Sequence, residues 1–408
     1  MQVDSLLRQT LGVKWIRVKR VQQVGHVIHA WLVPRAGSRP RCSVCGKKRP
    51  AYDTRPERRW RYVRLWGIRV LLHYRPRRAD CPRCGQMIED MPWSCGKSPL
   101  SRQLVVLLAQ LARLLPWEEV SRMMNESWNT IRAAVKTAVT YGLAVRDTSG
   151  IVVIGVDEIS RRRGQTYQTN VYDLQAKRLV WTGEGRGMET LQRFFTEWGP
   201  ERCKQITAVC CDMWDPYINV IKQHLPQATL VFDKFHIVQH LCQAIDTVRK
   251  EEVREKETTN PEVLAGTKYI WLKNPENLTD KQQARLGDLE KLNLKINRAY
   301  LLKEAFKRFW DYSYPACAEK FIGDWCSMAM RSRLKPLQKF VKMVREHQSN
   351  IMTYFRYRVT NAVTEGLNRK AKVLSQRAYG FRTSENYGLA LMHMMGGLAL
   401  PPITHRFL

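Results

Sequence analysis

"IVVIGVDEIS", residues 151–160, begins a series of predicted strands and helices from which a fold class can be inferred. Five of its first six residues are apolar and polar segments flank it, a pattern typical of a buried strand, with Asp157 at the polar end. The segments at 166–174 and 177–185 predict two further strands joined by a short turn. An amphipathic helix is predicted next, from Met188 to Trp198.

Two more apolar runs follow, and each leads directly into an aspartate. ITAVCCDMWDPY at 206–217 predicts a buried strand that reaches Asp212, with Pro216 starting the next helix. ATLVFDKFH at 228–236 predicts a fifth strand. Three strands, a helix, a strand, a helix and a strand are the element order of a ribonuclease-H-like fold. An α/β protein with a mixed five-stranded sheet is therefore expected.

The two strand-end aspartates are the first candidates for chemistry. A strand end fixes a side chain rigidly, and two carboxylates brought together there repel each other unless a cation lies between them. Mg²⁺ prefers such oxygen ligands. Asp157 and Asp212 are therefore predicted to bind magnesium.

NAVTEGLNRKAK at 361–372 supplies a third carboxylate. Asn361, Glu365, Asn368 and Lys372 are four, three and four residues apart, which puts them on one polar face of a helix. Asn361 and Asn368 are predicted to orient Glu365, and Lys372 to touch a phosphate. The alternative is a solvated helix face without a function in binding.

Glu365 and the two aspartates together provide enough oxygen donors to hold two Mg²⁺ ions about 4 Å apart. Such a pair activates water or a 3′-hydroxyl and stabilises the leaving oxygen of a phosphodiester. Phosphoryl transfer on DNA is the predicted reaction.

Other polar residues near these strands have competing interpretations. Glu158 would point to the opposite face of its strand from the residue before it. Asp173 and Asp215 are predicted to serve in turns or helix caps. Asp233 and His236 follow the fifth strand and are predicted to support the metal ligands or to contact DNA. Packing of a lone histidine in the core is the alternative.

The front of the chain carries a cysteine pattern. Four cysteines form two C-x-x-C pairs, each followed by glycine: Cys42 with Cys45, and Cys81 with Cys84. This is the pattern of a zinc ribbon with one structural Zn²⁺ ion, although two unrelated pairs of buried thiols remain the alternative. A strand pair predicted within 58–78 fills the long gap between the pairs, and Cys95 has no evident partner.

A helix-turn-helix is predicted next. Apolar residues recur at helical spacing from Leu100 to Leu115, and Pro116 ends the run. A short helix over 117–124 and a helix over 128–141 capped by Ser127 would follow. In a basic region this pair is typical of DNA binding, although any helical hairpin looks similar. The predicted groove-facing residues are Asn129, Thr130, Arg132 and Lys136.

The charge and the cysteine content of the chain indicate its binding partner and its cellular compartment. The net charge of +31 indicates a polyanionic partner, and residues 1–100 hold 22 Lys and Arg against 6 Asp and Glu. Double-stranded DNA is the predicted partner; a generally basic enzyme is the alternative. The eleven cysteines are too scattered for a disulfide framework, and no apolar run is long enough to span a membrane. We therefore expect a cytoplasmic, nucleoid-associated protein.

The remaining sequence predicts a helical insertion within the catalytic region. Between 238 and 354 the composition is charged and helical, and Trp271 is a candidate for stacking on a DNA base. Five segments are predicted: a zinc-ribbon domain at 1–97, a helix-turn-helix region at 98–145, the catalytic core at 150–237, the insertion at 238–354 and the C-terminal part of the core, with Glu365, at 355–408.

These motifs, taken together, carry a resemblance to a known family. GVDEIS, CDMWDPY, FDKFHIVQH and NAVTEGLNRKAK, followed by RAYGFR, resemble the DDE transposases of bacterial insertion sequences, specifically the ISL3 group. The resemblance implies that Asp157, Asp212 and Glu365 are the metal-binding triad. It also implies that the front end binds the terminal inverted repeats of the element, and that the protein acts as a homodimer or larger assembly on transposon-end and target DNA.

Two other functions are compatible with the same residues. A DNA-binding regulator would use the zinc ribbon and helix-turn-helix and keep the ribonuclease-H-like part for structure alone. A structure-specific nuclease or resolvase would cut DNA without joining it to a target. The intact acidic triad favours the transposase.

Overall fold

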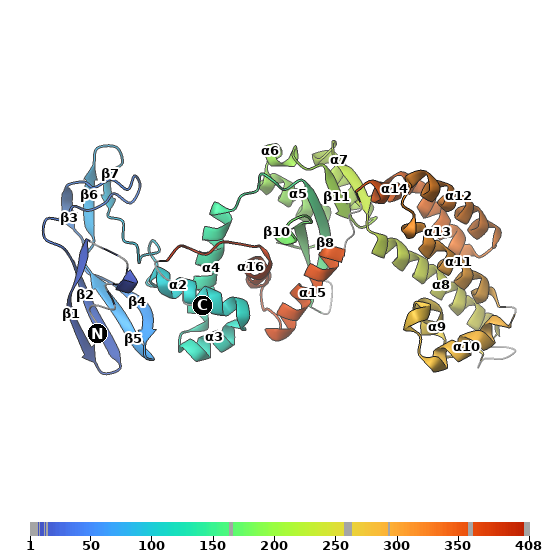
Figure 1. The fold of residues 1–408 in the computed structure, drawn as a ribbon, viewed down its shortest axis with the longest axis horizontal. Helices are drawn as coiled ribbons and strands as arrows, with labels where there is room; N and C mark the ends of the chain where they lie inside the picture. The colour runs from blue at the N-terminus through green and yellow to red at the C-terminus, as the bar shows by residue number, and fades with distance from the viewer. Residues whose placement is uncertain are drawn as a thin grey trace. The chain divides into compact units, whose positions relative to one another are not determined.

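The computed structural model describes residues 7, 9–11, 13, 15–162, 166–256, 263–292, 294–357 and 362–403. The chain forms two compact units. The first contains residues 1–147 together with 371–408, and the second contains residues 148–370. Figure 1 follows the elements of both units along the chain.

The first unit begins with a four-stranded sheet in the order β1-β2-β5-β4. Its strands are β1 (Ile16–Val24), β2 (Val27–Pro34), β4 (Arg58–Leu65) and β5 (Ile68–Tyr74). In its core, the rings of Trp60 and Tyr74 both pack edge to face against Trp93, and all three are at most 1% exposed. The predicted strand pair is confirmed as β4 and β5, whereas β1 and β2 were not among the predicted strands.

A second, three-stranded sheet adjoins the first. It has the order β3-β6-β7 and consists of β3 (Ala51–Thr54), β6 (Arg77–Cys81) and β7 (Gly85–Ile88). Glu89 links the two sheets, because it pairs with Arg77 at 2.8 Å and accepts a hydrogen bond from the Tyr74 hydroxyl at 2.7 Å. Glu89 is 2% exposed, so this buried carboxylate has the partners that burial demands.

Helices complete the first unit. They are α2 (Arg102–Leu114), α3 (Trp117–Met124), α4 (Trp128–Val145) and α16 (Ser384–Met395). Ser127 caps α4 as predicted, since its side chain accepts a hydrogen bond from the backbone N–H of Thr130. Asn125, with a φ of 45°, ends α3 in the left-handed conformation. The two helices and the three-residue turn between them are therefore as the sequence predicts, except that α4 continues to Val145.

The second unit is built on the mixed five-stranded sheet that the sequence predicts. Its order is β10-β9-β8-β11-β12. The strands are β8 (Val153–Arg162), β9 (Thr166–Asp173), β10 (Arg178–Glu184), β11 (Ala208–Cys211) and β12 (Thr229–Phe232). The first three form an antiparallel meander, and β11 and β12 run parallel to β8. Helices α5 (Met188–Trp198), α6 (Pro200–Cys203) and α7 (Asp215–His224) connect the strands.

The described residues from Lys234 to Tyr357 form helices and connecting segments. The helices are α8 (Lys234–Lys256), α9 (Lys268–Leu272), α10 (Asp280–Glu290), α11 (Lys295–Lys307), α12 (Pro315–Arg331), α13 (Lys335–Glu346) and α14 (Gln348–Tyr357), with short 3₁₀ turns at Pro275–Asn277 and Arg308–Asp311. They gather into one bundle (Figure 1). The hydroxyl of Thr353 on α14 donates to the carbonyl of Leu230 at 2.9 Å, which joins the bundle to β12.

The hypothesis that Trp271 stacks on a DNA base is wrong. Trp271 is 0% exposed, and its ring packs edge to face against Tyr300 at 5.7 Å. Lys303, itself 2% exposed, donates a hydrogen bond to the Trp271 carbonyl at 2.6 Å. Trp271 belongs to the core of the helical bundle, because burial of its apolar ring stabilises the fold.

The compact units divide the chain differently from the predicted segments at one point. Helix α15 (Ala362–Arg377) crosses the boundary between the units at residues 370 and 371, whereas 355–408 was predicted as one part of the catalytic core. The other predicted boundaries stay predictions. Within the described ranges, no helix combines the length and the apolarity that crossing a membrane requires.

Candidate active site and metal centre

Three neighbouring parallel strands bring an aspartate to one level of the sheet. Asp157 was predicted at a strand end, but it lies within β8, where it pairs with Asn170 of β9, because β8 continues to Arg162. Gly155 pairs with Cys210 across β8 and β11. Cys211 pairs with Phe232 across β11 and β12. Continued past these pairs, the register reaches three aspartates: Asp157, Asp212 and Asp233. Partners in a parallel register share one face of the sheet, so these three carboxylates lie at the same level and on the same face, Asp157 within its strand and the other two just past the ends of theirs.

His236 lies between two of these aspartates. On the first turn of α8, its Nδ1 is 3.7 Å from Asp212 Oδ2 and its Nε2 is 3.6 Å from Asp233 Oδ2. Asp233 is 4% exposed and accepts a hydrogen bond from the backbone N–H of Phe235 at 3.0 Å, which fixes it at the start of α8. The Asp212 carboxylate is 40% exposed and therefore open to a ligand.

Helix α15 is docked on β8 at two points. A Cβ atom on Gly155 would lie 2.8 Å from the hydroxyl oxygen of buried Thr364, so the missing side chain lets the helix approach the strand. One turn later, Asn368 donates a hydrogen bond to Asp157 Oδ2 at 2.6 Å. The Tyr172 hydroxyl in turn donates to Asn368 Oδ1 at 2.5 Å. This chain of hydrogen bonds fixes the amide and orients the carboxylate.

Glu365 lies between these two docking points in sequence, and its side chain is exposed. It is three residues before Asn368, so the two side chains are neighbours on one side of the helix. Among the described residues, no hydrogen bond or ion pair joins Glu365 to Asp157 or Asp212. Lys372 is exposed further along α15, and Asn361 lies outside the described residues.

The environment of Asp157 disfavours its charged form. Burial raises the pKa of Asp157 to about 6, although the backbone N–H of Glu158 at 2.7 Å and the nearby His236 and Asn368 oppose the shift. The Asp233 carboxylate raises this pKa further. A divalent cation would relieve both the burial cost and the repulsion, so this set of oxygen donors fits Mg²⁺.

Asp157→Asn is expected to stabilise the metal-free protein at about pH 8, by roughly 1–3 kcal/mol. The folded pKa near 6 is above the ordinary value of 3.8, so folding opposes the charged carboxylate above about pH 6. This carboxyl should therefore make wild-type stability rise as the pH falls from about 6 to about 4, and below about pH 3, where both states are protonated, the variant loses its advantage. Urea unfolding in the presence of a chelator measures this, and a variant less stable than wild type at about pH 8 would contradict it.

The competing acids have identifiable structural surroundings. Burial raises the pKa of Glu158, and the hydrogen bond from the Tyr217 hydroxyl opposes that shift. Asp173 accepts hydrogen bonds from the backbone N–H groups of Gln175 and Ala176 at 3.1 and 3.0 Å, the turn function that the sequence predicts. Asp215 is the first residue of α7, again as expected of a helix start.

The four cysteines of the two C-x-x-C pairs converge. Their sulfur atoms all lie within 4.8 Å of one another, and Cys45 Sγ is 3.7 Å from Cys81 Sγ. Burial opposes ionisation of Cys81, but the backbone N–H groups of Arg83 and Cys84 and the neighbouring thiols lower its pKa to about 6. Four convergent sulfur ligands, one of them ionised near neutral pH, fit a tetrahedral Zn²⁺ site.

Three of the four predicted groove-facing residues have contacts within the protein. Thr130 is 8% exposed, and its hydroxyl is 2.9 Å from that of Ser127. Arg132 and Lys136 face α16, where they pair with Glu385 at 2.7 and 3.4 Å. Thr130 is buried and so not available to a groove, whereas the predicted DNA contacts of Arg132 and Lys136 stay predictions, since the Lys136 side chain is 59% exposed. Asn129 is exposed.

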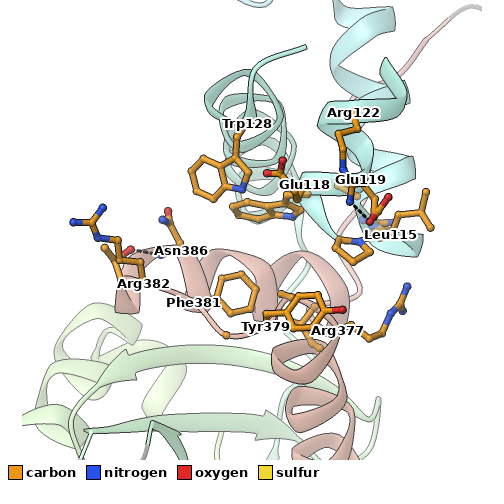
Figure 2. A pocket seen from close by; sticks show the side chains of 18 residues that line it. Leu115, Glu118, Glu119, Arg122, Trp128, Arg377, Tyr379, Phe381, Arg382 and Asn386 are labelled. Carbon is orange, nitrogen blue, oxygen red and sulfur yellow. Dashed lines mark hydrogen bonds and ion pairs between the residues drawn. The ribbon is translucent and has the colours of Figure 1, made fainter. Parts of the chain in front are cut away.

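A cavity of about 460 Å³ lies beside the helix-turn-helix (Figure 2). The Trp117 ring packs at 5.4 Å from that of Trp128 and edge to face at 6.1 Å from that of Phe381. Figure 2 shows Trp128 and Phe381 on opposite sides of the opening, with Arg382 at its rim. RAYGFR, residues 377–382, therefore forms one wall of this cavity and contacts the helix-turn-helix.

Sequence reasoning missed the residues that dock α15. Gly155, Thr364 and Tyr172 were not singled out, although each has a detectable signal. A glycine inside an otherwise apolar strand indicates close approach of another element, and here it stands two residues before a candidate ligand. Tyr172 pairs with Gly155 across β8 and β9, so it shares the face of Asp157, but only the register shows this.

Comparison with known proteins gives one consistent result. Residues 154–391 match a protein family described as Transposase, the DDE transposases of the ISL3 group. The chain is 29% identical to the transposase for insertion sequence element IS1001 of Bordetella parapertussis, over 96% of this chain and 97% of that one. It is 28% identical to the transposase for insertion sequence element IS1557 of Mycobacterium tuberculosis, over 91% and 89% of the two chains.

Proposed function

Because the chain belongs to the ISL3 group of DDE transposases, we propose that it binds the terminal inverted repeats of an insertion sequence and catalyses Mg²⁺-dependent DNA cleavage and strand transfer. Membership of this family implies an enzyme that acts on DNA. The terminal repeats as substrate, the two-metal reaction and a homodimer or larger assembly as the active form are parts of the proposal.

One observation carries the proposal for the chemistry. Asp157 within β8 and Asp212 just past the end of β11 lie at one level of two in-register parallel strands, and a helix bearing Glu365 is docked on the first of them through Asn368. The strand order, with a meander followed by two parallel strands, supports a ribonuclease-H-like core. Together with Glu365, the two aspartates would form the donor set expected for phosphoryl transfer.

Each side chain of the site would have a separate role in the reaction. Asp157, Asp212 and Glu365 would hold two Mg²⁺ ions, which supply activation of the attacking hydroxyl and stabilisation of the leaving oxygen. Asn368 would keep Asp157 in one orientation, and Asp233 would do the same for His236 beside Asp212.

DNA recognition would come from the front of the chain and from α15. Zn²⁺ bound by the four cysteines would hold the three-stranded sheet together, and the start of α4 with Asn129 would enter the major groove. Lys372, exposed on α15, would contact a phosphate. Concentrated basic charge near the front predicts that this binding weakens steeply with salt.

A strand-transfer assay tests the proposal. The protein is incubated with Mg²⁺, a labelled duplex carrying the inverted repeat that brackets its own coding region, and a supercoiled target plasmid. We expect cleavage at the repeat end and covalent joining to the plasmid. Cutting without joining would indicate a nuclease or resolvase instead. Specific binding without any cutting would indicate a DNA-binding regulator.

A further inference from the structure

The β4–β5 hairpin ends in a tryptophan that is exposed to solvent. Trp66 and Gly67 form the two-residue loop between the strands, and Leu65 pairs with Ile68 across it. Trp66 is 75% exposed. The other tryptophans, all of them among the described residues, are buried or half-buried. This large apolar ring is therefore held outside the protein's own core.

The backbone at this position is unfavourable for such a residue. φ is 49° at Trp66 and 78° at Gly67, the two positive values of a type I′ turn. Asn-Gly is the preferred pair in this turn, because a bulky residue is strained at positive φ. The β1–β2 hairpin, which also has a two-residue loop, places Gly25 at its first loop position. A strained and exposed tryptophan is typical of a residue kept for binding rather than for stability.

Polar contacts fix the hairpin to the turn between α3 and α4. Arg61 Nη1 is 2.5 Å from Glu126 Oε2, and that carboxylate is 5% exposed. Arg64 donates hydrogen bonds to the carbonyl oxygens of Gly67 and Asn125, each at 3.1 Å. The hairpin tip and the start of α4 are therefore held in one arrangement, so that a duplex bound to one also meets the other.

The hairpin is also strongly basic. Residues 58–74 contain five arginines and no acidic residue. Arg64 on β4 and Arg69 on β5 are the arginines nearest the tip, and both are half-buried. Positive charge on both strands around an exposed aromatic ring is complementary to a nucleic-acid backbone rather than to a protein core.

We infer that the β4–β5 hairpin is a wing that binds the minor groove of the terminal-repeat duplex, with Trp66 as an apolar wedge. The inference rests on the proposed function, which puts the start of α4 in the neighbouring major groove. The minor groove is about 6 Å wide and accommodates a narrow hairpin tip. An apolar side chain inserted there partly unstacks a base step and bends the duplex, while flanking arginines contact phosphates.

The Trp66→Asn variant tests DNA binding without weakening the fold, because Asn-Gly is a more favourable pair than Trp-Gly in this turn. We expect the Tm of this variant to equal or exceed that of wild type. Its affinity for a terminal-repeat duplex should be weaker by roughly tenfold to a hundredfold, the effect of removing one stacked ring. Fluorescence anisotropy at one fixed salt concentration measures the affinity, and hydroxyl-radical footprinting should show protection lost only in the minor groove beside the α4 contact.

Two variants serve as controls. Tyr314→Asn removes a 74% exposed ring just before α12 in the helical bundle and should keep the affinity and the footprint of wild type. Trp66→Phe retains an aromatic wedge and should lose less affinity than Trp66→Asn.

The outcomes are distinguishable. In one outcome, wild type prefers the terminal repeat to an unrelated duplex while Trp66→Asn binds the repeat as tightly as wild type with an unchanged footprint. In that case the inferred minor-groove contact of the hairpin is wrong, and the proposed function stands. If wild type shows no preference for the repeat, the proposed end recognition fails, and the wing fails with it. Loss of affinity together with a lowered Tm would overturn the inference in favour of a structural role for Trp66.

Discussion

Asp157→Ala, Asp212→Ala and Glu365→Gln should each reduce cleavage of terminal-repeat DNA about a thousandfold or more, with binding of the same DNA nearly unchanged. Loss of one metal ligand removes several kcal/mol of transition-state stabilisation, and about 4 kcal/mol corresponds to a thousandfold in rate. Glu365→Gln is the most specific of the three, because it keeps the size of an exposed side chain and removes only its charge. Single-turnover cleavage and anisotropy binding measure the two quantities.

Asp215→Asn is a suitable control for these variants. Asp215 is three residues after Asp212 and carries the same functional group, but it is the first residue of α7. Its replacement should change the cleavage rate only a few-fold. Near-normal cleavage by any two of the three triad variants would rule out the proposed catalytic set.

Cys81→Ser should remove the bound zinc and with it specific binding to the terminal repeat. The three-stranded sheet has a buried apolar cluster of only Cys42, Ala79 and Cys81, with Cys45, Cys84 and Met87 packed against it. So small a core does not hold a sheet without a metal, and zinc binding at such sites supplies the folding free energy. We expect one zinc per chain in wild type, none in the variant, and an affinity for the repeat lowered about a hundredfold or more.

Cys95→Ser is the matched control, since Cys95 is a half-buried thiol outside the four-cysteine cluster. It should keep the zinc and the affinity. Elemental analysis of freshly purified protein gives the zinc content directly. Wild type without zinc, or a Cys81→Ser variant that retains it, would show that the thiols serve another purpose.

The central sheet and the cysteine cluster were predictable because their signals are local. Each strand of the sheet is an apolar run with clear ends, and a C-x-x-C pair requires its two thiols to lie together. The same runs lead to Asp157 and Asp212, although Asp157 lies within β8 and not at its end, because the strand continues into polar residues up to Arg162. That Asp233 shares their level depends on the register of β12, which pairing in three dimensions fixes and apolar patterning does not.

The placement of α15 and the orientation of α4 could not be predicted in the same way. Helical periodicity gives the polar face of α15, but contact with β8 depends on the space that Gly155 leaves for Thr364. Likewise, the four-residue spacing of Arg132 and Lys136 predicts only that both side chains lie on one polar face of α4. Only tertiary packing shows that Glu385, about 250 residues later in the chain, pairs with both.

The most direct test of the account is a crystal structure of the protein bound to terminal-repeat DNA and Mn²⁺, with the ions located by anomalous scattering. We expect two manganese peaks beside the five-stranded sheet, with Asp157 and Asp212 as ligands and Glu365 completing the set from α15. Manganese elsewhere, or peaks at the aspartates with Glu365 directed away from both ions while the DNA end is bound, would contradict it.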